Sequence, residues 1–264
     1  MSAQDDKPED KLAPLFDLPE MVKKVRAQTP ARLLAGRSGA AYRTNTQLEL
    51  REAHASARDA VRAELNLFTN AAGDAMQKWS LFEVCTQAAS KDEYLLRPDL
   101  GRCLNEASRA EVERRCTTGN DLQVVIGDGL SVTAVAAQIP RLLPLLRDGA
   151  TARGWNVGPI FVVRHCRVGI LNEVGDLLAP KVAILLIGER PGLATAESLS
   201  AYMAYRPKAS DNDANRNLIS NIHARGVSPE QAAQRILNLA ALMIEAKTSG
   251  AQLREQWPPL LIQP

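Results

Sequence analysis

The sequence lacks several features that would place it in a particular class of protein. No run of apolar residues among its 264 is long enough to cross a bilayer. The polar, acidic segment MSAQDDKPEDKLAP does not resemble a secretory signal. The four cysteines lie far apart without a Cys-x-x-Cys pair, which argues against a zinc site or a disulfide framework and favours a reducing compartment. The net charge is +2, and no basic block favours nucleic acid or a membrane surface as a partner.

The sequence also lacks a recognisable catalytic or metal-binding constellation. Its three histidines, His54, His165 and His223, are scattered, and no two have the spacing of metal ligands. We expect His54 to pack in the core, His165 to lie within a strand, and His223 to lie in a polar loop. No nucleophile stands beside a base in the pattern of a catalytic triad, so we predict neither catalytic residues nor a metal site in this chain.

The chain divides into three regions by pattern. Residues 1–20 are charged with few large apolar residues, which is typical of a flexible lead-in. Residues 21–118 are mainly helical in pattern, and Thr46 with Glu49 predicts a capping box at the start of one helix. From residue 119 to residue 264 apolar runs alternate with helical patterns, which predicts an α/β core.

The α/β core has a regular order of elements. Strand, helix, strand, short crossover and strand in succession predict a doubly wound, mostly parallel sheet of the Rossmann-like kind, carrying a helical N-terminal extension. Pro140 suits a helix start, and Ser228 with Pro229 and Gln231 predicts the start of a helix that ends at Gly250. The expected strands are residues 122–129, 160–170 and 181–192, and the expected helices are 131–138, 140–154, 172–180 and 231–250.

Two glycine-containing turns follow expected strands. In VIGDGLS (125–131), Gly127 and Gly129 could let backbone N–H groups approach an anion, but Val132 stands where a dinucleotide pattern needs its third glycine. A tight turn that ends the strand is the slightly favoured alternative. In GERPG (188–192), Glu189 and Arg190 emerge where doubly wound sheets bind ligands. A functional role is somewhat favoured there over a surface Glu–Arg pair.

Two further segments, 202–207 (YMAYRP) and 216–226 (RNLISNIHARG), are rich in Tyr, Arg, Asn and Ser. We expect loops there, and loops of this composition either bind ligands or are simply solvated.

Four segments occur in an order and spacing that resemble the light chain of ethanolamine ammonia-lyases. They are VVIGDGLS, RVGILNEVGDLL, VAILLIGERPGLATAESLSAYMAYRP and RNLISNIHARG. Upstream, TPARLLAGRSGAAYRTNTQLELREAHASARDAV and LLRPDLGR are similar to the same family, so the resemblance covers roughly residues 20–250. The stretches GERPGLATAESLS and RNLISNIH carry most of its specificity.

The resemblance implies an activity, a cofactor and a partner. Enzymes of this family convert ethanolamine to acetaldehyde and ammonia by radical chemistry that starts with homolysis of the cobalt–carbon bond of adenosylcobalamin. It implies that a large subunit holds the substrate in a barrel and carries the catalytic residues. It also implies that the small subunit has a Rossmann-like core, with cobalamin between the two subunits.

The resemblance also implies three cofactor contacts. The valine of the family's GRV stretch corresponds to Val168, although Cys166 replaces the glycine, and the glutamate of GERPG is Glu189. The third contact falls on Leu218, where some relatives have cysteine and where leucine leaves only an apolar or backbone contact. A carboxylate suits the amides on the rim of cobalamin, and apolar side chains suit its ring surfaces. We add the hypothesis that Arg190 lies near the nucleotide phosphate.

Two other interpretations stay open from the residues alone. One is a self-sufficient nucleotide-dependent enzyme that uses VIGDGLS, and the other is a non-catalytic interaction protein that uses the GERPG edge. The lead-in shows little apolar periodicity before about residue 15, unlike the extended segment linked to packaging in bacterial microcompartments in longer relatives. We therefore expect a cytoplasmic location rather than packaging in a microcompartment.

Overall fold

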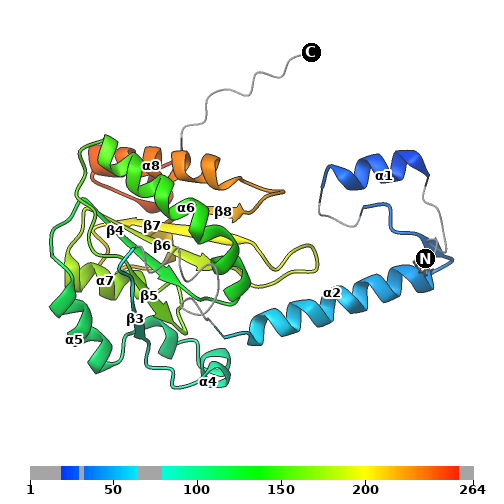
Figure 1. Ribbon diagram of the computed structural model, residues 1–264, viewed down its shortest axis with the longest axis horizontal. Helices are drawn as coiled ribbons and strands as arrows, with labels where there is room; N and C mark the ends of the chain where they lie inside the picture. The colour runs from blue at the N-terminus through cyan, green and yellow to red at the C-terminus, as the bar shows by residue number, and fades with distance from the viewer. Residues whose placement is uncertain (1–18, 30–32, 65–78, 256–264) are drawn as a thin grey trace, which may run out of the picture. The chain divides into compact units, whose positions relative to one another are not determined.

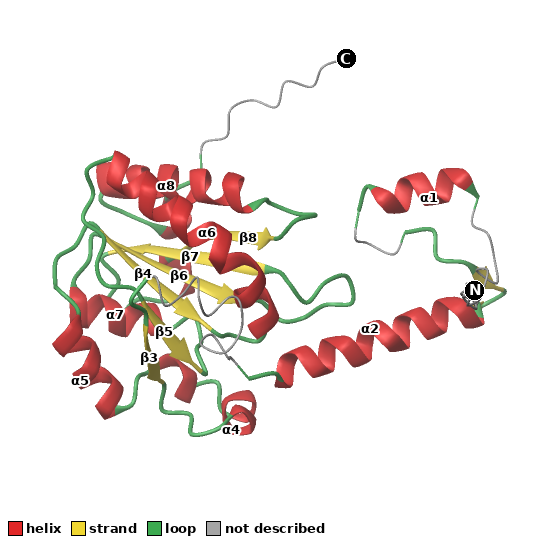
Figure 2. Cartoon of the chain, in the orientation of Figure 1, coloured by secondary structure: helices red, strands yellow, loops and turns green. Residues whose placement is uncertain are grey.

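A computed structural model describes residues 19–29, 33–64 and 79–255 of the chain (Figures 1 and 2). The chain forms two compact units, residues 1–47 and residues 48–264. Most of the predicted lead-in and the whole tail 257–264 lie outside the described residues.

The first unit holds little buried surface in its described part. Helix α1 (Glu20–Ala27) has no buried residue, and strands β1 (Arg37–Ser38) and β2 (Ala41–Tyr42) form an exposed antiparallel pair. Helix α2 (Thr44–Arg62) begins two residues before the predicted N-cap Thr46, so the expected capping box is wrong.

The second unit is built on a six-stranded mixed sheet with the strand order β3-β5-β4-β6-β7-β8. The first four strands in this order are parallel, and β7 and β8 are antiparallel additions at one side. The expectation of an α/β fold with a mostly parallel sheet is thus confirmed. The strands are β3 (Phe82–Cys85), β4 (Leu122–Gly127), β5 (Phe161–Arg164), β6 (Val182–Gly188), β7 (Leu199–Tyr205) and β8 (Asn217–Ile222).

Helices cover both faces of this sheet (Figures 1 and 2). Helices α6 and α8 pack together on one face, and α7 and α5 lie against the other. Every residue of β4 and β6 is buried, as expected for central strands of a sheet that is covered on both sides. The helices of this unit, besides α2, are α4 (Lys91–Leu96), α5 (Glu106–Arg115), α6 (Val132–Ala152), α7 (Ile170–Leu178) and α8 (Pro229–Ala246), and the 3-10 turns are η1 (Leu100–Arg102), η2 (Asp213–Asn215) and η3 (Gly250–Gln252).

Three strands depart from the sequence expectation. The segments 202–207 and 216–226 were expected to be loops, but most of their residues form β7 and β8. Strand β3 lies in the region expected to be mainly helical and pairs with β5 along four residues. Each of these strands gains its ladder from a neighbour far away in sequence, which a local pattern does not reveal.

Two helix boundaries also differ. Pro140 does not start a helix, because α6 runs through both Pro140 and Pro144. Its apolar face is packed from Val132 to Ala150, and this packing outweighs the backbone hydrogen bonds that proline cannot make. Helix α8 starts where Ser228, Pro229 and Gln231 predicted, with Ser228 and Gln231 forming a capping box, but it ends at a left-handed Lys247 instead of reaching Gly250.

Candidate functional site

The three predicted cofactor contacts lie around the carboxyl ends of the parallel strands and on the adjoining antiparallel strands. Val168 is half-buried between the end of β5 and the start of α7, and Glu189 directly follows β6. Leu218 lies in β8 with 46% of its surface exposed, although it is a large apolar residue.

The Glu189 carboxylate is held by two hydroxyl groups. Ser198 Oγ donates to Glu189 Oε2 at 3.0 Å, and Ser200 Oγ donates to Glu189 Oε1. The backbone N–H of Asn221 also points at Oε1, at 3.5 Å. A carboxylate has about four acceptor positions, so these contacts fix its orientation while leaving capacity for a donor from a ligand.

Tyr202 links Glu189 to Leu218 across the sheet. Ser200 and Tyr202 are two residues apart in β7, so their side chains lie on the same face. Tyr202 pairs directly with Leu218 in the ladder between β7 and β8, so these two side chains also share that face. Glu189, Tyr202 and Leu218 therefore belong to one surface, which is the α7 side of the sheet.

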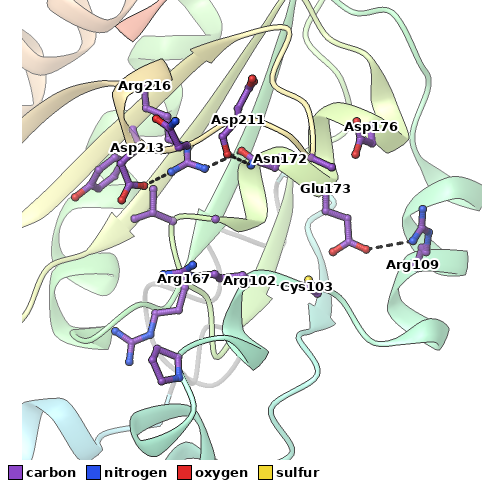
Figure 3. Close-up of a pocket in the computed structure, with 16 residues that line it drawn as sticks. Arg102, Cys103, Arg109, Arg167, Asn172, Glu173, Asp176, Asp211, Asp213 and Arg216 are labelled. Atoms are coloured by element: carbon purple, nitrogen blue, oxygen red, sulfur yellow. Dashed lines mark hydrogen bonds and ion pairs between the residues drawn. The ribbon is translucent and has the colours of Figure 1, made fainter. Parts of the chain in front are cut away.

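A pocket of about 860 Å³, shown in Figure 3, opens on the same side. Tyr202 and Val168 both line it, so Val168 joins the surface that carries Leu218. Asn172 on α7 organises one wall: its Oδ1 accepts from Arg216 at 2.7 Å, and its Nδ2 donates to the Asp211 carbonyl at 2.8 Å. The remaining lining is Pro98, Arg102, Cys103, Arg109, Arg167, Gly169, Glu173, Asp176, Ala209, Asn212 and Asp213.

The pocket is charged with both signs. Arg109 pairs with Glu173 at 3.6 Å, and the almost buried Arg216 side chain pairs with Asp213 (Figure 3). Paired charges of this kind offer both donors and acceptors to a polar ligand or a partner surface.

The polar groups of the VIGDGLS turn bind other groups of the same chain. Gly129 has a φ of 59°, and a Cβ there would overlap the Gly188 carbonyl oxygen, so the glycine allows a left-handed turn and close strand packing. Lys91 Nζ donates to the Gly129 carbonyl at 3.2 Å and lies 3.9 Å from Asp128 Oδ2. Ser131 caps α6 by accepting from Ala134 N–H. These contacts favour the interpretation as a tight turn over that as an anion site.

Comparison with known proteins gives a consistent result. Residues 19–254 match the family model described as ethanolamine ammonia-lyase light chain. An ethanolamine ammonia-lyase small subunit of Clostridium perfringens is 40% identical over 235 residues, which is 89% of this chain and 78% of that protein. A small subunit of Listeria monocytogenes is 42% identical over 232 residues (88% and 77%), and one of Clostridium acetobutylicum is 36% identical over 244 residues (92% and 98%).

The chain belongs to the ethanolamine ammonia-lyase light-chain family. The resemblance predicted from the sequence is thereby confirmed, and with it the assignment to an ammonia-lyase of which this chain is one subunit.

Arg190 of this light chain lies next to Glu189 and is exposed. Within the described part of the chain, no ion pair joins these two residues, so the alternative of an internal Glu–Arg surface pair finds no support. Burial raises the pKa of the Tyr94 phenol, and the nearby positive charges of Arg167 and Arg190 oppose this shift because they favour the phenolate. Two guanidinium groups therefore lie near this end of the sheet.

The histidines of the light chain differ from expectation in place. His54 is exposed on α2, so its predicted core packing is wrong. His165 lies one residue beyond β5 in a left-handed conformation, and His223 is buried, with only 3% exposed, rather than placed in an open polar loop. Among the described residues, no group of three or more His, Cys, Asp or Glu side chains is arranged to hold a metal ion.

Several residues of the light-chain site carry no signal in the sequence. Tyr202 and Asn172 lie in segments expected to be a loop and a plain crossover, and only the strand register and the pocket reveal their position.

Within the described ranges, no helix has the length and apolar character needed to cross a membrane.

Proposed function

We propose that this chain is the small subunit of an adenosylcobalamin-dependent ethanolamine ammonia-lyase. In this role it helps to hold the cofactor against a large subunit that carries the catalytic residues. The observation that carries the proposal is the family match across residues 19–254. The enzyme would convert ethanolamine to acetaldehyde and ammonia.

The residues on the α7 side of the sheet fit the chemistry of cobalamin. Glu189 is oriented by Ser198 and Ser200 and retains acceptor capacity for amide N–H groups of the corrin rim. Leu218 has 46% of its surface exposed and offers apolar surface, and half-buried Val168 adds to it. These two side chains suit the apolar faces of the ring and its base.

Bound adenosylcobalamin would supply the radical chemistry, and the residues of this chain would bind and orient it. Burial of the Val168, Glu189 and Leu218 surface beneath a large subunit would also exclude water from the cofactor. Exposed Arg190 would contact the nucleotide phosphate, because a guanidinium can donate two hydrogen bonds to it.

The fold and location complete the proposal. Residues 119–264 would form a Rossmann-like, doubly wound core, to whose edge β3 adds one strand from the mainly helical region 21–118. Helices on both faces and the parallel order of β5, β4 and β6 support this interpretation. We place the assembled enzyme in the cytoplasm.

Reconstitution tests the function directly. Ammonia formation from ethanolamine and adenosylcobalamin is measured for this chain, for the large subunit of the same source, and for their mixture. We expect activity only in the mixture. A mixture of two folded chains that releases no ammonia would refute the proposal.

The Glu189→Gln variant tests the site. Glutamine keeps one acceptor oxygen but loses the charge, so cobalamin should bind to the variant complex about tenfold more weakly, or about 1.4 kcal/mol. Spectroscopic titration of the complex with adenosylcobalamin measures the affinity. Glu245→Gln on the exposed side of α8 is the matched control and should bind cobalamin normally. Equal affinities for Glu189→Gln and the control would remove Glu189 from the site.

A further inference from the structure

The turn that leads into Val168 has an unusual backbone. His165 has a φ of 56°, a left-handed conformation that residues with a side chain rarely adopt. The turn also packs closely on β4, because buried Cys166 fills the space beside Gly127, where a Cβ would come within 2.8 Å of the Cys166 Sγ. Such a conformation persists only where the surroundings hold it.

Asp128, at the end of β4, holds this turn by two consecutive N–H groups. Its Oδ2 accepts from His165 N at 2.9 Å, and its Oδ1 accepts from Cys166 N at 2.8 Å. Both carboxylate oxygens are therefore used by backbone that lies 37 and 38 residues further along the chain.

Other segments hold the carbonyl groups of the same turn. Thr86 Oγ1 donates to the His165 carbonyl at 3.1 Å, and the Tyr94 hydroxyl donates to the Cys166 carbonyl at 3.0 Å. The next N–H, that of Arg167, donates to the Gly101 carbonyl at 2.7 Å. Every backbone polar group from His165 N to Arg167 N thus has a partner outside the turn.

The carboxylate that anchors the turn is buried. Asp128 is 2% exposed, and its cationic neighbour Lys91 is 8% exposed. Burial raises the pKa of Asp128, while Lys91 and the N–H groups of Cys166 and His165 oppose that shift. A buried ion pair stabilises a fold little compared with apolar packing. The buried pair of Lys91 and Asp128 therefore suggests a role more specific than stability.

The anchored turn ends at the cofactor surface. Val168 is the first residue after the held segment, and it lines the pocket beside the start of α7. We propose that Asp128 is a positioning residue of the cobalamin site, which fixes the His165–Arg167 turn and thereby sets Val168 against the cofactor. This inference rests on the proposed function, because Val168 must contact cobalamin for the positioning to matter.

The Asp128→Asn variant, assembled with the large subunit, tests the positioning. Asparagine can accept only one of the two N–H groups through its oxygen, so the turn should loosen. We expect the KM for adenosylcobalamin to rise about tenfold, while kcat at saturating cofactor and the KM for ethanolamine stay unchanged. This split follows because a loosened contact weakens cofactor binding without altering the catalytic large subunit.

The chain offers a matched control at the opposite end of β4. Asp121 precedes the strand, and its Oδ2 accepts from Asn156 N at 2.8 Å while its Oδ1 pairs with Lys181 at 2.7 Å. Asp121→Asn removes a similar anchor far from the cofactor surface, and it should leave the KM for adenosylcobalamin unchanged.

A double-mutant cycle shows whether Asp128 acts through Val168. If it does, Asp128→Asn combined with Val168→Ala should raise the KM for cobalamin no more than the stronger single change. Additive effects, or equal values for Asp128→Asn and Asp121→Asn, would overturn the inference.

If Asp128→Asn fails to fold, Tyr94→Phe replaces it, because it removes only the donor to the Cys166 carbonyl. It should raise the KM about threefold, and an unchanged value would count against the positioning.

The two proposals fail in distinguishable ways. If the unmodified complex neither binds adenosylcobalamin nor releases ammonia, the proposed function fails and the positioning role falls with it. If the unmodified complex does both and Asp128→Asn has a normal KM for cobalamin, only the positioning role is overturned.

Discussion

At the scale of single residues, a neutral histidine holds the turn after β8. His223 Nδ1 accepts from Arg225 N at 3.2 Å, which leaves Nε2 to donate to Asn221 Oδ1 at 2.7 Å. Asn221 has a φ of 61°, and its backbone N–H points at Glu189. The uncharged ring therefore supports a strained residue that contacts the candidate cofactor site.

This arrangement predicts a pH dependence of stability. Burial, with a smaller contribution from Arg225, lowers the pKa of His223 below its ordinary value of 6.5. A histidine with a lowered folded-state pKa contributes stability above the unfolded pKa and loses it as the pH falls through the folded pKa. Thermal unfolding of the wild type at pH 7.5 and pH 5 should show this loss. His223→Gln cannot be protonated, so its loss over the same range should be smaller.

The control for that measurement is His54→Gln, since His54 is exposed on α2. This variant should lose as much stability as the wild type on acidification. Identical pH profiles for the wild type and His223→Gln would contradict the assignment of a neutral, structurally engaged ring.

At the scale of elements, the central part of the fold could be predicted from sequence and the sheet edges could not. Strands β4 and β6 are mostly apolar, and α6 and α8 have apolar faces, so the local pattern predicted these elements, although it divided α6 at Pro140. Strand β3 has only four residues, and the polar and aromatic side chains of β7 made its alternation of buried and outward-facing residues hard to recognise. The edge strands depend on their partners, and these partners are distant in sequence.

Helix α7 depends on one glycine for its position. A Cβ at Gly175 would overlap the Pro207 carbonyl oxygen, so the helix lies directly on the backbone that connects β7 to β8. Gly175→Ala should therefore lower the free energy of unfolding by about 2 kcal/mol, even though alanine favours helices. Urea denaturation measures this change.

Gly192→Ala is the matched control, because nothing lies within 4 Å of a Cβ there. It should leave the free energy of unfolding within about 0.5 kcal/mol of the wild type. A stable Gly175→Ala variant would show that α7 can move away from the connection at little cost.

At the scale of the whole molecule, the candidate site is assembled from distant segments. Family resemblance implied Val168, Glu189 and Leu218 as cofactor contacts, but not that Tyr202 joins them into one surface. Asp128 remained hidden for the same reason, since its partners follow 37 residues later and no local spacing signals them. Residue chemistry is readable from sequence, whereas convergence of residues depends on the topology of the sheet.

The division into two units predicts that the core folds without the first one. The described part of residues 1–47 buries only Thr46, whereas the apolar clusters on both faces of the sheet lie in residues 48–264. Removal of residues 1–43 should lower the free energy of unfolding by less than about 1 kcal/mol. Urea denaturation followed by circular dichroism checks this, and loss of the cooperative transition would contradict it.

Asp128 accepts hydrogen bonds from two consecutive N–H groups, and this limits which residues can occupy the position in the family. No other standard side chain can make both hydrogen bonds at this position, because asparagine offers one acceptor oxygen and the glutamate side chain is longer. Leu218, by contrast, has 46% of its surface exposed in β8. We therefore expect substitutions to be tolerated better at exposed Leu218 than at buried Asp128, although Leu218 is the one of the two that is proposed to contact the cofactor.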